Sequence, residues 1–525
     1  RHRIAGSLAA LLTLTVTAVP LEGYCWDADA PIRLANAAIT FAGAEVPPRT
    51  VADFLPPVLR KVTIAMPAAP SPAESNAVVQ LAAAVADRNG QKPEVAVVPL
   101  PDGATTLPAP SVPFERQIVV KEGPDKGLSL RGGPGVPALL ISGPGDELTD
   151  QARLLAADSL RYAVSPTSVA DTLPESPFEP DNTTLEQLSG SGLTSEALWP
   201  KVGVEIDQTR WGRPIGGVTV HLIGSYTPLP DNFGGEVIAS VGNEVLARWP
   251  AEAAGTIDRT VTIPDRFLKR FTSVEVEVRT TGNPGHCGDH LPILLRLDGS
   301  TGIQVNSANP PMPQGFQSLP QALMPTIRVG IGRDAFGDTV RAAQIVMGLR
   351  RDSGVPLATE VTTLQQAMDS TDPAILISAD GWDNSKIALP FSTDQGRLTV
   401  TGVDAQGQSV TLNLEPAQAF GSLQTVFDGQ RTVLIATSTG APRQLDELLR
   451  YLGGPGRWSG LNGRAIISAP GSAPVTVPNP PSAYSAQSGQ SNGSRGETWF
   501  WWAVGGVAAV AAAGALAILL RARRA

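Results

Sequence analysis

The densest group of side chains that could bind a metal is Pro284–His290 (PGHCGDH), where His286 and His290 stand on either side of Cys287. Thiolate and imidazole are the usual ligands of zinc, but a structural zinc site needs four ligands with recognisable paired spacings. The whole chain holds four His and two Cys, and no second cluster of this kind occurs in the sequence. We therefore predict a Gly-rich loop between two strands and no metal site.

Two Gly-containing turns could bind phosphate instead, because each stands between a predicted strand and a predicted helix. These turns, Ser142–Gly145 (SGPG) and Gly330–Gly332 (GIG), fit neither GxGxxG nor GxxxxGK[ST]. A third such turn, 66–72 (MPAAPSP), contains three prolines, which have no N–H group to offer a phosphate oxygen. We predict tight strand-to-helix turns that bind no flavin or nucleotide, and no cofactor.

Nucleophilic catalysis has no visible centre in this sequence. GxSxG is absent, and His221 lies in an alternating strand, where we expect it to pack rather than to serve a triad. We predict that the protein is not an enzyme.

Aromatic side chains between residues 203 and 305 could bind sugars, because a sugar ring stacks its apolar C–H face on an exposed aromatic ring. The candidates are Trp211, Tyr226 and Trp249, together with Phe233, and Trp211 is the strongest because its neighbours are polar. The alternative is that these rings fill the core of the domain that carries them.

The elements around these residues fall into two α/β domains, predicted at 58–172 and 326–480. Residues 61–90 and 326–354 each read as a strand, a turn and an amphipathic helix, and so do 136–160 and 431–452. Strands that alternate with helices indicate a parallel sheet covered on both faces.

The region between them differs, because short alternating runs separated by Gly, Pro, Asn and Asp predict an antiparallel β-sandwich at 173–305. A Pro-rich connector follows at 306–325, and a short extended segment is predicted at 31–57. A Ser/Gly-rich stretch, 481–498, is flexible by composition.

Both ends of the sequence carry membrane signals. Basic residues before an apolar run predict a signal peptide at 1–30, with a retained signal anchor as the alternative. Residues 499–520 contain no charge and, at about 1.5 Å per residue, are long enough to cross a bilayer. Aromatic residues before this run and basic residues after it place the tail 521–525 in the cytoplasm and the bulk of the chain outside. The predicted interface residues are Trp499, Phe500, Trp501, Trp502, Arg521, Arg523 and Arg524.

One face of this predicted membrane helix is smooth. Gly505, Ala509 and Ala513 recur every four residues, which would let a neighbouring helix approach closely. The formal net charge of −9 argues against nucleic acid as a partner. Two cysteines, Cys25 and Cys287, are too few for a disulfide framework.

This order of parts resembles the family of extracytoplasmic accessory subunits of bacterial cellulose synthase. The resemblance covers residues 58–525 and is most specific at 260–281 (TVTIPDRFLKRFTSVEVEVRTT), the Cys loop GHCGDH and the turn Asp298–Ser300. It implies flavodoxin-like α/β domains, a jelly-roll-like carbohydrate-binding sandwich, and a C-terminal helix packed on a polytopic glycosyltransferase, the catalytic subunit of the synthase. Members are often labelled cyclic di-GMP-binding regulators, but the family's nucleotide is read by the catalytic subunit, and nothing in this sequence supports binding here.

The chain departs from the family pattern in two places. Family members usually carry a sandwich before each α/β domain, whereas residues 31–57 can supply only one or two strands of a first one. The amphipathic helix expected before the membrane helix is replaced by the Ser/Gly-rich stretch. The glycan can therefore differ from cellulose.

The resulting hypothesis is a membrane-anchored, extracytoplasmic, non-catalytic accessory subunit of a polysaccharide synthase, with a glycan polymer and a membrane glycosyltransferase as partners. The alternatives are a stand-alone surface glycan-binding protein or adhesin and, less favoured, an exported hydrolase.

Overall fold

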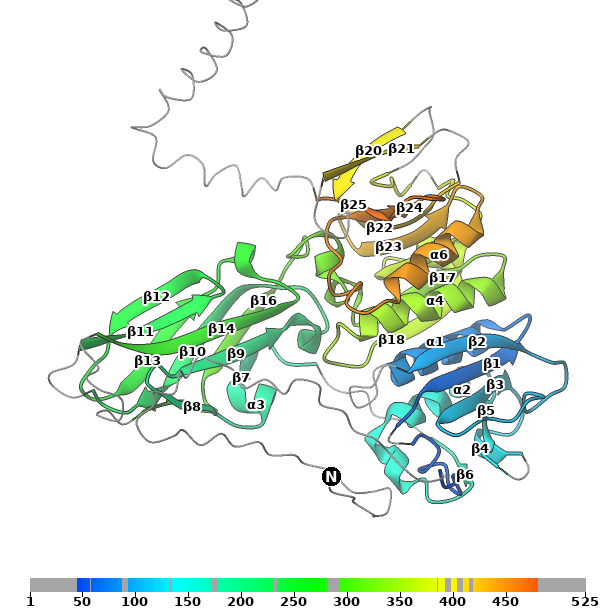
Figure 1. Cartoon of the computed structure of the whole chain (residues 1–525), viewed down its shortest axis with the longest axis horizontal. Coiled ribbons are helices and arrows are strands. Elements are labelled where there is room, and N and C mark those ends of the chain that lie inside the picture. The colour runs from blue at the N-terminus through cyan, green and yellow to red at the C-terminus, as the bar shows by residue number, and fades with distance from the viewer. Residues whose placement is uncertain are drawn as a thin grey trace, which may run out of the picture. The chain divides into compact units, whose positions relative to one another are not determined.

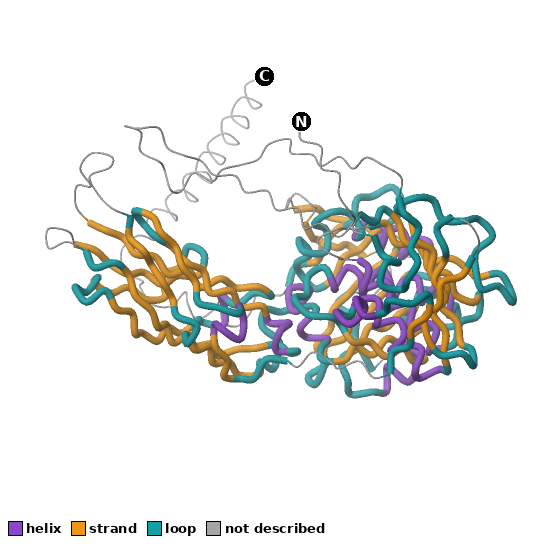
Figure 2. Tube along the Cα trace, turned by 90° about the horizontal axis from the view of Figure 1, so that it is seen from below, coloured by secondary structure: helices purple, strands orange, loops and turns teal. Residues whose placement is uncertain are grey.

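The computed structural model describes residues 45–479, except 57, 87–92, 133–134, 172–177, 230–233, 282–291, 385, 392–397, 404–408 and 415–418. Over these residues the chain is mostly β-sheet, arranged in four sheets, with few helices (Figure 1). Figure 2 shows that the helices gather beside two of the sheets, whereas the other two are almost free of them.

The first sheet is mixed, not wholly parallel as the sequence predicted. Its order is β2-β1-β3-β5-β4-β6, in which β2, β1, β3 and β5 run parallel, β4 pairs antiparallel with β5, and β6 pairs antiparallel with β4. Two packed helices, α1 and α2, accompany it. The bounds are β1 (Lys61–Pro67), α1 (Pro72–Ala86), β2 (Glu94–Leu100), β3 (Glu115–Glu122), β4 (Gly127–Arg131), β5 (Ala138–Gly143), α2 (Gly145–Arg153) and β6 (Thr167–Ser168).

Helices cover only one face of this sheet, which corrects the expectation of helices on both. Ile64, Ile118 and Leu139 point into the core shared with α1, whereas their neighbours Ala65, Val119 and Leu140 form a separate small cluster on the other face. Partly buried Ala104 and Leu107 cover that cluster. They belong to the β2–β3 connection, 101–114, whose four prolines disfavour the crossover helix expected between parallel strands.

The second α/β part is also built on a mixed sheet, in the order β18-β17-β19-β23-β22-β24-β25-β20-β21. The first four strands are parallel and the remaining pairs are antiparallel. Helices α4 and α6 pack on one face and α5 on the other. The bounds are β17 (Thr326–Ile331), α4 (Ala335–Arg350), β18 (Ala358–Thr363), α5 (Leu364–Asp369), β19 (Ala374–Ser378), β20 (Leu398–Val403), β21 (Ser409–Leu414), β22 (Gly421–Phe427), β23 (Thr432–Ser438), α6 (Pro442–Leu452), β24 (Ala465–Ser468) and β25 (Val475–Val477).

The two α/β parts pack directly on each other, although the sandwich separates them in sequence. Helix α1 contacts α4 and β18, and one hydrophobic cluster includes residues of both parts. Polar pairs cross the contact: Thr339 Oγ1 lies 2.9 Å from Ser75 Oγ, and Thr359 Oγ1 donates to Asn76 Oδ1 at 2.8 Å. The equivalent first helices of the two repeats therefore form the centre of the α/β body.

The antiparallel sandwich predicted from the sequence is present. One sheet has the order β7-β16-β10-β15-β8, with β13 also paired to β10, and the other has the order β12-β11-β14-β9. Inward-facing residues of both sheets form one hydrophobic cluster, which includes Val204, Val220 and Val276. The bounds are β7 (Asn182–Thr184), α3 (Leu185–Ser189), β8 (Leu193–Ala197), β9 (Lys201–Asp207), β10 (Ile215–Tyr226), β11 (Gly234–Val241), β12 (Glu244–Pro250), β13 (Thr256–Thr262), β14 (Phe271–Thr281), β15 (Ile293–Leu297) and β16 (Gly302–Ser307).

The predicted N-terminal segment and the predicted connector both pack into the α/β core. Of the predicted segment 31–57, the described residues 45–56 contain no strand, and Val51 and Phe54 are fully buried in that core. The Pro-rich connector likewise buries Phe316 and Leu323 in the same core. Both segments tie the ends of the α/β body to its centre.

Replacement of Gly348 in α4 by alanine is expected to destabilise the second α/β part. Alanine normally stabilises a helix relative to glycine, by up to about 1 kcal/mol. Here, however, an added Cβ would lie 2.1 Å from Cε2 of the buried Trp458 indole. Forced displacement of a packed ring costs about 1–3 kcal/mol, which urea titration would detect. The same substitution in a Trp458→Leu background should be nearly neutral, and an equal loss in both backgrounds would contradict this steric account.

Candidate functional site

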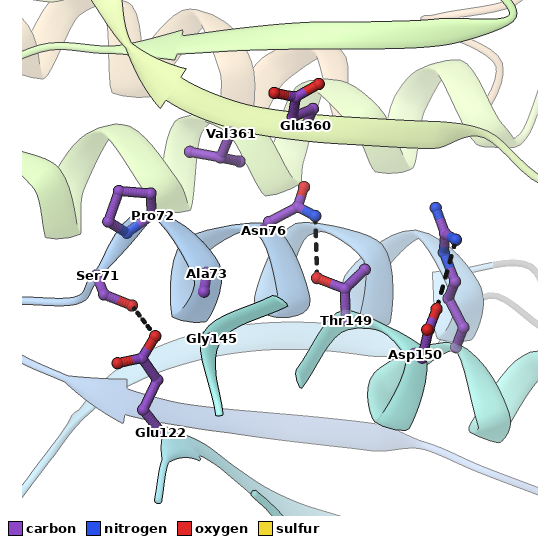
Figure 3. A pocket seen from close by; sticks show the side chains of 11 residues that line it. Ser71, Pro72, Ala73, Asn76, Glu122, Gly145, Thr149, Asp150, Glu360 and Val361 are labelled. Atoms are coloured by element: carbon purple, nitrogen blue, oxygen red, sulfur yellow. Dashed lines mark hydrogen bonds and ion pairs between the residues drawn. The ribbon is translucent and has the colours of Figure 1, made fainter. Parts of the chain in front are cut away.

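A hollow of about 510 Å³ lies at the carboxyl edge of the first sheet (Figure 3). Ser71 precedes α1, Glu122 ends β3, Gly145 begins α2, and Glu360 and Val361 come from β18 of the other α/β part. The carboxyl ends of parallel strands are the usual ligand-binding edge of an α/β sheet. This position makes the hollow a candidate functional site.

The serine in this hollow is used to hold the helix in place. Ser71 Oγ lies 3.1 Å from Glu122 Oε1 and accepts the N–H of Glu74 at 3.1 Å, while Glu74 Oε2 accepts the Ser71 N–H at 2.9 Å. This reciprocal pair is a capping box at the start of α1. Ser71 contacts two carboxylates and no histidine among the described residues, so we see no activated nucleophile there.

The charges that line the hollow are mostly negative. Glu122, Asp150 and Glu360 line it, and the one basic lining residue, Arg153, lies 3.7 Å from Asp150. Figure 3 shows the paired Ser71 and Glu122 and, farther along, the hydrogen bond from Asn76 to Thr149. A phosphate group would meet net repulsion here, because its charge has the same sign as the lining.

Carboxylates of the chain itself occupy the N–H groups where phosphate would bind. In the first α/β part Glu74 accepts the N–H groups of Ser71 at 2.9 Å and Glu122 at 2.8 Å. In the second, Asp338 Oδ2 accepts the Gly332 N–H at 2.8 Å and Asp334 accepts that of Gly337 at 3.0 Å. The absence of a flavin or nucleotide site stays a prediction, and these contacts supply its physical reason.

The Asp338 carboxylate sits in a low-dielectric environment. Burial raises its pKa, which its hydrogen bonds to Arg341 and to the Gly332 N–H partly oppose. Arg341 also binds Asp446 of α6, at 2.8 Å from Nε and 3.3 Å from the second terminal nitrogen. Burial lowers the pKa of Arg341, but the hydrogen bonds that its guanidinium donates to Asp446 and Asp338 outweigh the burial and raise this pKa overall. The cluster links α4 to α6 and to the turn after β17, which is a structural role.

Two of the four aromatic residues proposed to bind sugar are core residues, and that prediction is corrected. Trp211 is 2% exposed and donates its indole N–H to Pro180 O at 3.0 Å. Tyr226 is 4% exposed, and its hydroxyl donates to Glu252 O at 3.0 Å. Burial raises the pKa of Tyr226. Neither ring has a free face, because both pack in the sandwich core and find backbone partners for their polar atoms.

The third candidate, Trp249 in β12, is partly buried against the same core, so only part of its ring is accessible to a ligand. An aromatic residue that the sequence interpretation passed over is more accessible: Trp199 is 46% exposed, with its indole N–H 3.3 Å from Thr280 Oγ1. It lies in the β8–β9 connection, outside the alternating runs. Phe233 lies outside the described residues.

His221 does not pack, contrary to the expectation from its strand. Its ring is about half exposed on the outer face of β10, and Nε2 lies 2.7 Å from Asp258 Oδ1 of β13. The carboxylate is itself largely exposed. This pair is a surface contact on a sheet face.

Several predicted sites fall outside the described residues. These are the Cys287 loop, the signal peptide, the interface residues Trp499–Trp502 and Arg521–Arg524, and the helix face of Gly505, Ala509 and Ala513. Within the part of the chain that the structure does describe, no helix combines the length and apolar character needed to span a bilayer.

Comparison with known proteins gives no family. No protein-family model matches this chain, and no curated protein matches it. Among solved structures, the chain is similar to the structure of infectious bursal disease virus Gx strain, with 10% identity over 26% of this chain and a TM-score of 0.12. The match spans 41% of that protein's chain. A likeness this weak carries no argument about fold or function.

Proposed function

We propose that this chain is a membrane-anchored, extracytoplasmic, non-catalytic accessory subunit of a polysaccharide synthase, which receives or guides the glycan as it leaves the membrane. The observation that carries the proposal is the antiparallel sandwich placed in sequence between two α/β parts. This is the order of parts that the resemblance to the accessory subunits of cellulose synthase implies. The glycan is cellulose or a related polymer.

The strand orders support a flavodoxin-like origin of both α/β parts. The parallel strands of the first part follow the order β2-β1-β3-β5, and those of the second follow β18-β17-β19-β23. In each, the second strand in sequence lies at the edge beside the first, as in the doubly wound 2-1-3-4 arrangement. The reversed strand β4, the short strand β6 beside it and the lack of a helix between β2 and β3 are local departures from that plan.

The carboxyl edge of the first sheet supports a scaffolding role for the α/β body. Ser71 and Glu74 there serve as a helix cap, and Asp338 and Arg341 serve the equivalent turn of the second part. These are the positions at which related sheets place cofactors or catalytic groups. Their use for internal contacts favours a protein that binds and positions over one that performs chemistry.

We further infer that residues 499–520 form a single-pass membrane helix that packs on the polytopic glycosyltransferase, with the C-terminus in the cytoplasm. Replacing Gly505, Ala509 and Ala513 together by leucine keeps the run apolar but roughens its smooth face. Membrane insertion should survive, whereas recovery of the glycosyltransferase in a pull-down and the output of glycan should both fall, by about tenfold for a loss near 1.4 kcal/mol.

The matched control replaces Leu516, Leu519 and Leu520 by isoleucine, which conserves volume and hydrophobicity, and it should change neither readout. If the smooth-face variant keeps both partner and product, the segment serves as an anchor alone. If no glycosyltransferase is recovered even with the unaltered chain, the stand-alone surface glycan-binding protein becomes the better hypothesis.

A further inference from the structure

Basic side chains gather where the sandwich contacts the second α/β part. The contact includes an ion pair, in which Arg270, next to β14, binds Asp352, which follows α4, at 2.9 Å. Lys269 precedes Arg270 in sequence, and Arg351 precedes Asp352. Arg351 also donates to the backbone oxygen of Gly453, just after α6, at 3.4 Å. One continuous region therefore joins the sandwich to the ends of α4 and α6.

We call the cations of this region the basic junction; its members are Lys269, Arg351, Arg450 and Arg457. Arg351 is partly buried and the other three are exposed. Arg450 lies in the last turn of α6, and Arg457, in the loop that follows, stacks on Tyr451 with its guanidinium carbon 4.6 Å from the ring centre. In the described part of the chain, none of the four has a carboxylate partner.

The acidic residues near the basic junction do not neutralise it. Asp352 is bound by Arg270, and Asp446 of α6 is bound by Arg341. Two further carboxylates remain, Asp207, which accepts the N–H and hydroxyl of Thr209, and the exposed Glu447 of α6. Four cations against these two carboxylates leave the region positive, although the formal net charge of the chain is −9.

Helix stabilisation explains only part of this set. Basic residues at the C-terminus of a helix bind its last carbonyl groups and oppose its dipole. Arg450 has that position, and Arg351 bonds to the oxygen of Gly453. Arg457, however, lies beyond the end of α6, and Lys269 belongs to the sandwich. These two cations serve no helix, so the cluster needs another explanation.

The last described strand, β25, is linked to the same region by hydrogen bonds. The bonds run from Arg270 to Phe316 O at 3.4 Å, from the Phe316 N–H to Gly463 O at 2.8 Å, and from the Arg464 N–H to Val477 O at 2.9 Å. Val477 ends β25, and the description stops two residues later. Residues 480–498 then lead to the predicted membrane helix, and even fully extended they span at most about 65 Å. The basic junction therefore lies within reach of the bilayer.

From these features we propose that the basic junction docks on the anionic phospholipid headgroups of the membrane that anchors the chain. A guanidinium matches the oxygens of a phosphate group in charge and in geometry. Each Lys or Arg close to an anionic bilayer strengthens association about fivefold. Phe271, beside Arg270, is 55% exposed and would contact the headgroup region, where aromatic rings collect. The inference rests on the proposed function, because the membrane helix is what holds this surface near the lipid.

The test places the full chain in nanodiscs of phosphatidylcholine alone or of an equal mixture with phosphatidylglycerol, an anionic lipid. Amide hydrogen exchange of peptides that cover 266–272 and 449–460 reports contact with the bilayer. We expect exchange in these peptides to slow at least about fivefold in the anionic discs at low salt. The difference should disappear at high salt, because the screening length shortens.

The variant combines Lys269→Gln, Arg450→Gln and Arg457→Gln and should lose this slowing while it still inserts into the discs. The matched control combines Arg49→Gln, Arg60→Gln and Arg131→Gln, which removes the same charge from exposed residues of the first α/β part. These three also have no carboxylate partner among the described residues. The control should keep the slowing, and thermal unfolding checks that both variants remain folded.

Failure of this surface and failure of the proposed function give different results. Insertion into both discs with equal exchange in the two lipids would overturn lipid docking and leave the accessory role standing. Equal loss of the slowing in both triple variants would also overturn it, because net charge alone would then set the attraction. Slowing that appears only after the glycosyltransferase is added would assign the basic junction to a protein partner instead. A chain that inserts into neither disc would contradict the membrane helix, and the proposed function and this surface would fall together.

Discussion

Arg116→Met is expected to destabilise the first α/β part by about 3–5 kcal/mol, the usual effect of breaking a buried ion pair by removing one partner. The side chains of Arg116 and Glu45 are 1% and 3% exposed, and they bond directly to each other. Arg116 also donates to the backbone oxygens of Phe54 and, at 2.8 Å, Glu115. Methionine would leave the Glu45 carboxylate buried with the N–H of Phe114, at 2.6 Å, as its remaining partner among the described residues.

The same pair holds the segment that precedes β1, so its loss should be visible locally. We expect limited proteolysis to begin within residues 45–56, with the urea midpoint of the α/β part falling at the same time. The control is Arg116→Met with Glu45→Met, which removes both charges and keeps apolar volume. It should recover most of the loss. Equal destabilisation by the single and double variants would show that the hydrogen bonds of Arg116 to the backbone, and not the buried charge, set the effect.

The strand–helix repeats could be predicted from the sequence because their signals are local. Residues 61–86 and 326–350 show an apolar strand followed by a helix, and the structure has β1, α1, β17 and α4 there. Strand direction was partly readable. The second sheet becomes mixed where β22 and β23 form a hairpin across residues 428–431 (DGQR), whose Asp-Gly pair is a local turn signal. The pairing of β24 with β22 across α6 has no such local signal.

The burial of the aromatic residues in the sandwich could be predicted in part from the sequence. In β10 the buried residues Val218, Val220 and Leu222 share their parity with Tyr226, so strict alternation already points Tyr226 inward and His221 outward. The polarity of the residues next to a ring in sequence does not predict which face of the strand the ring occupies. Trp211 gives no such signal because it ends a short 3₁₀ turn (Gln208–Trp211), where side chains do not alternate.

The polar contacts of the α/β body are of two kinds: some are local and could be predicted from the sequence, and others join residues far apart in the chain. The cap at α1 is visible as Ser71-Pro72-Ala73-Glu74, which matches the S-x-x-E capping signature. The partner of Arg116 is not visible, because Glu45 lies 71 residues away in sequence and meets it only after the chain has folded. The same is true of Arg341 and Asp446, which are separated by 105 residues.

Arg341→Met is expected to destabilise the second α/β part by about 3–5 kcal/mol at neutral pH, and by less as the pH falls. Asp338 is 2% exposed, and without the guanidinium its remaining hydrogen-bond donor among the described residues is the Gly332 N–H. The pKa of Asp338, which burial already raises, should therefore rise further. A carboxyl group whose pKa is higher in the folded state penalises folding when it is ionised, that is, above the folded pKa. The penalty disappears below the unfolded pKa of about 4. The difference in unfolding free energy between the variant and the unaltered protein should therefore shrink from pH 7 to pH 4, as measured by urea titration.

In the control, Arg341→Met with Asp338→Asn, the titrating group is absent, so this difference should be smaller at pH 7 and nearly independent of pH. A loss in the single variant that is the same at pH 7 and pH 4 would mean that Asp338 is not the group left uncompensated.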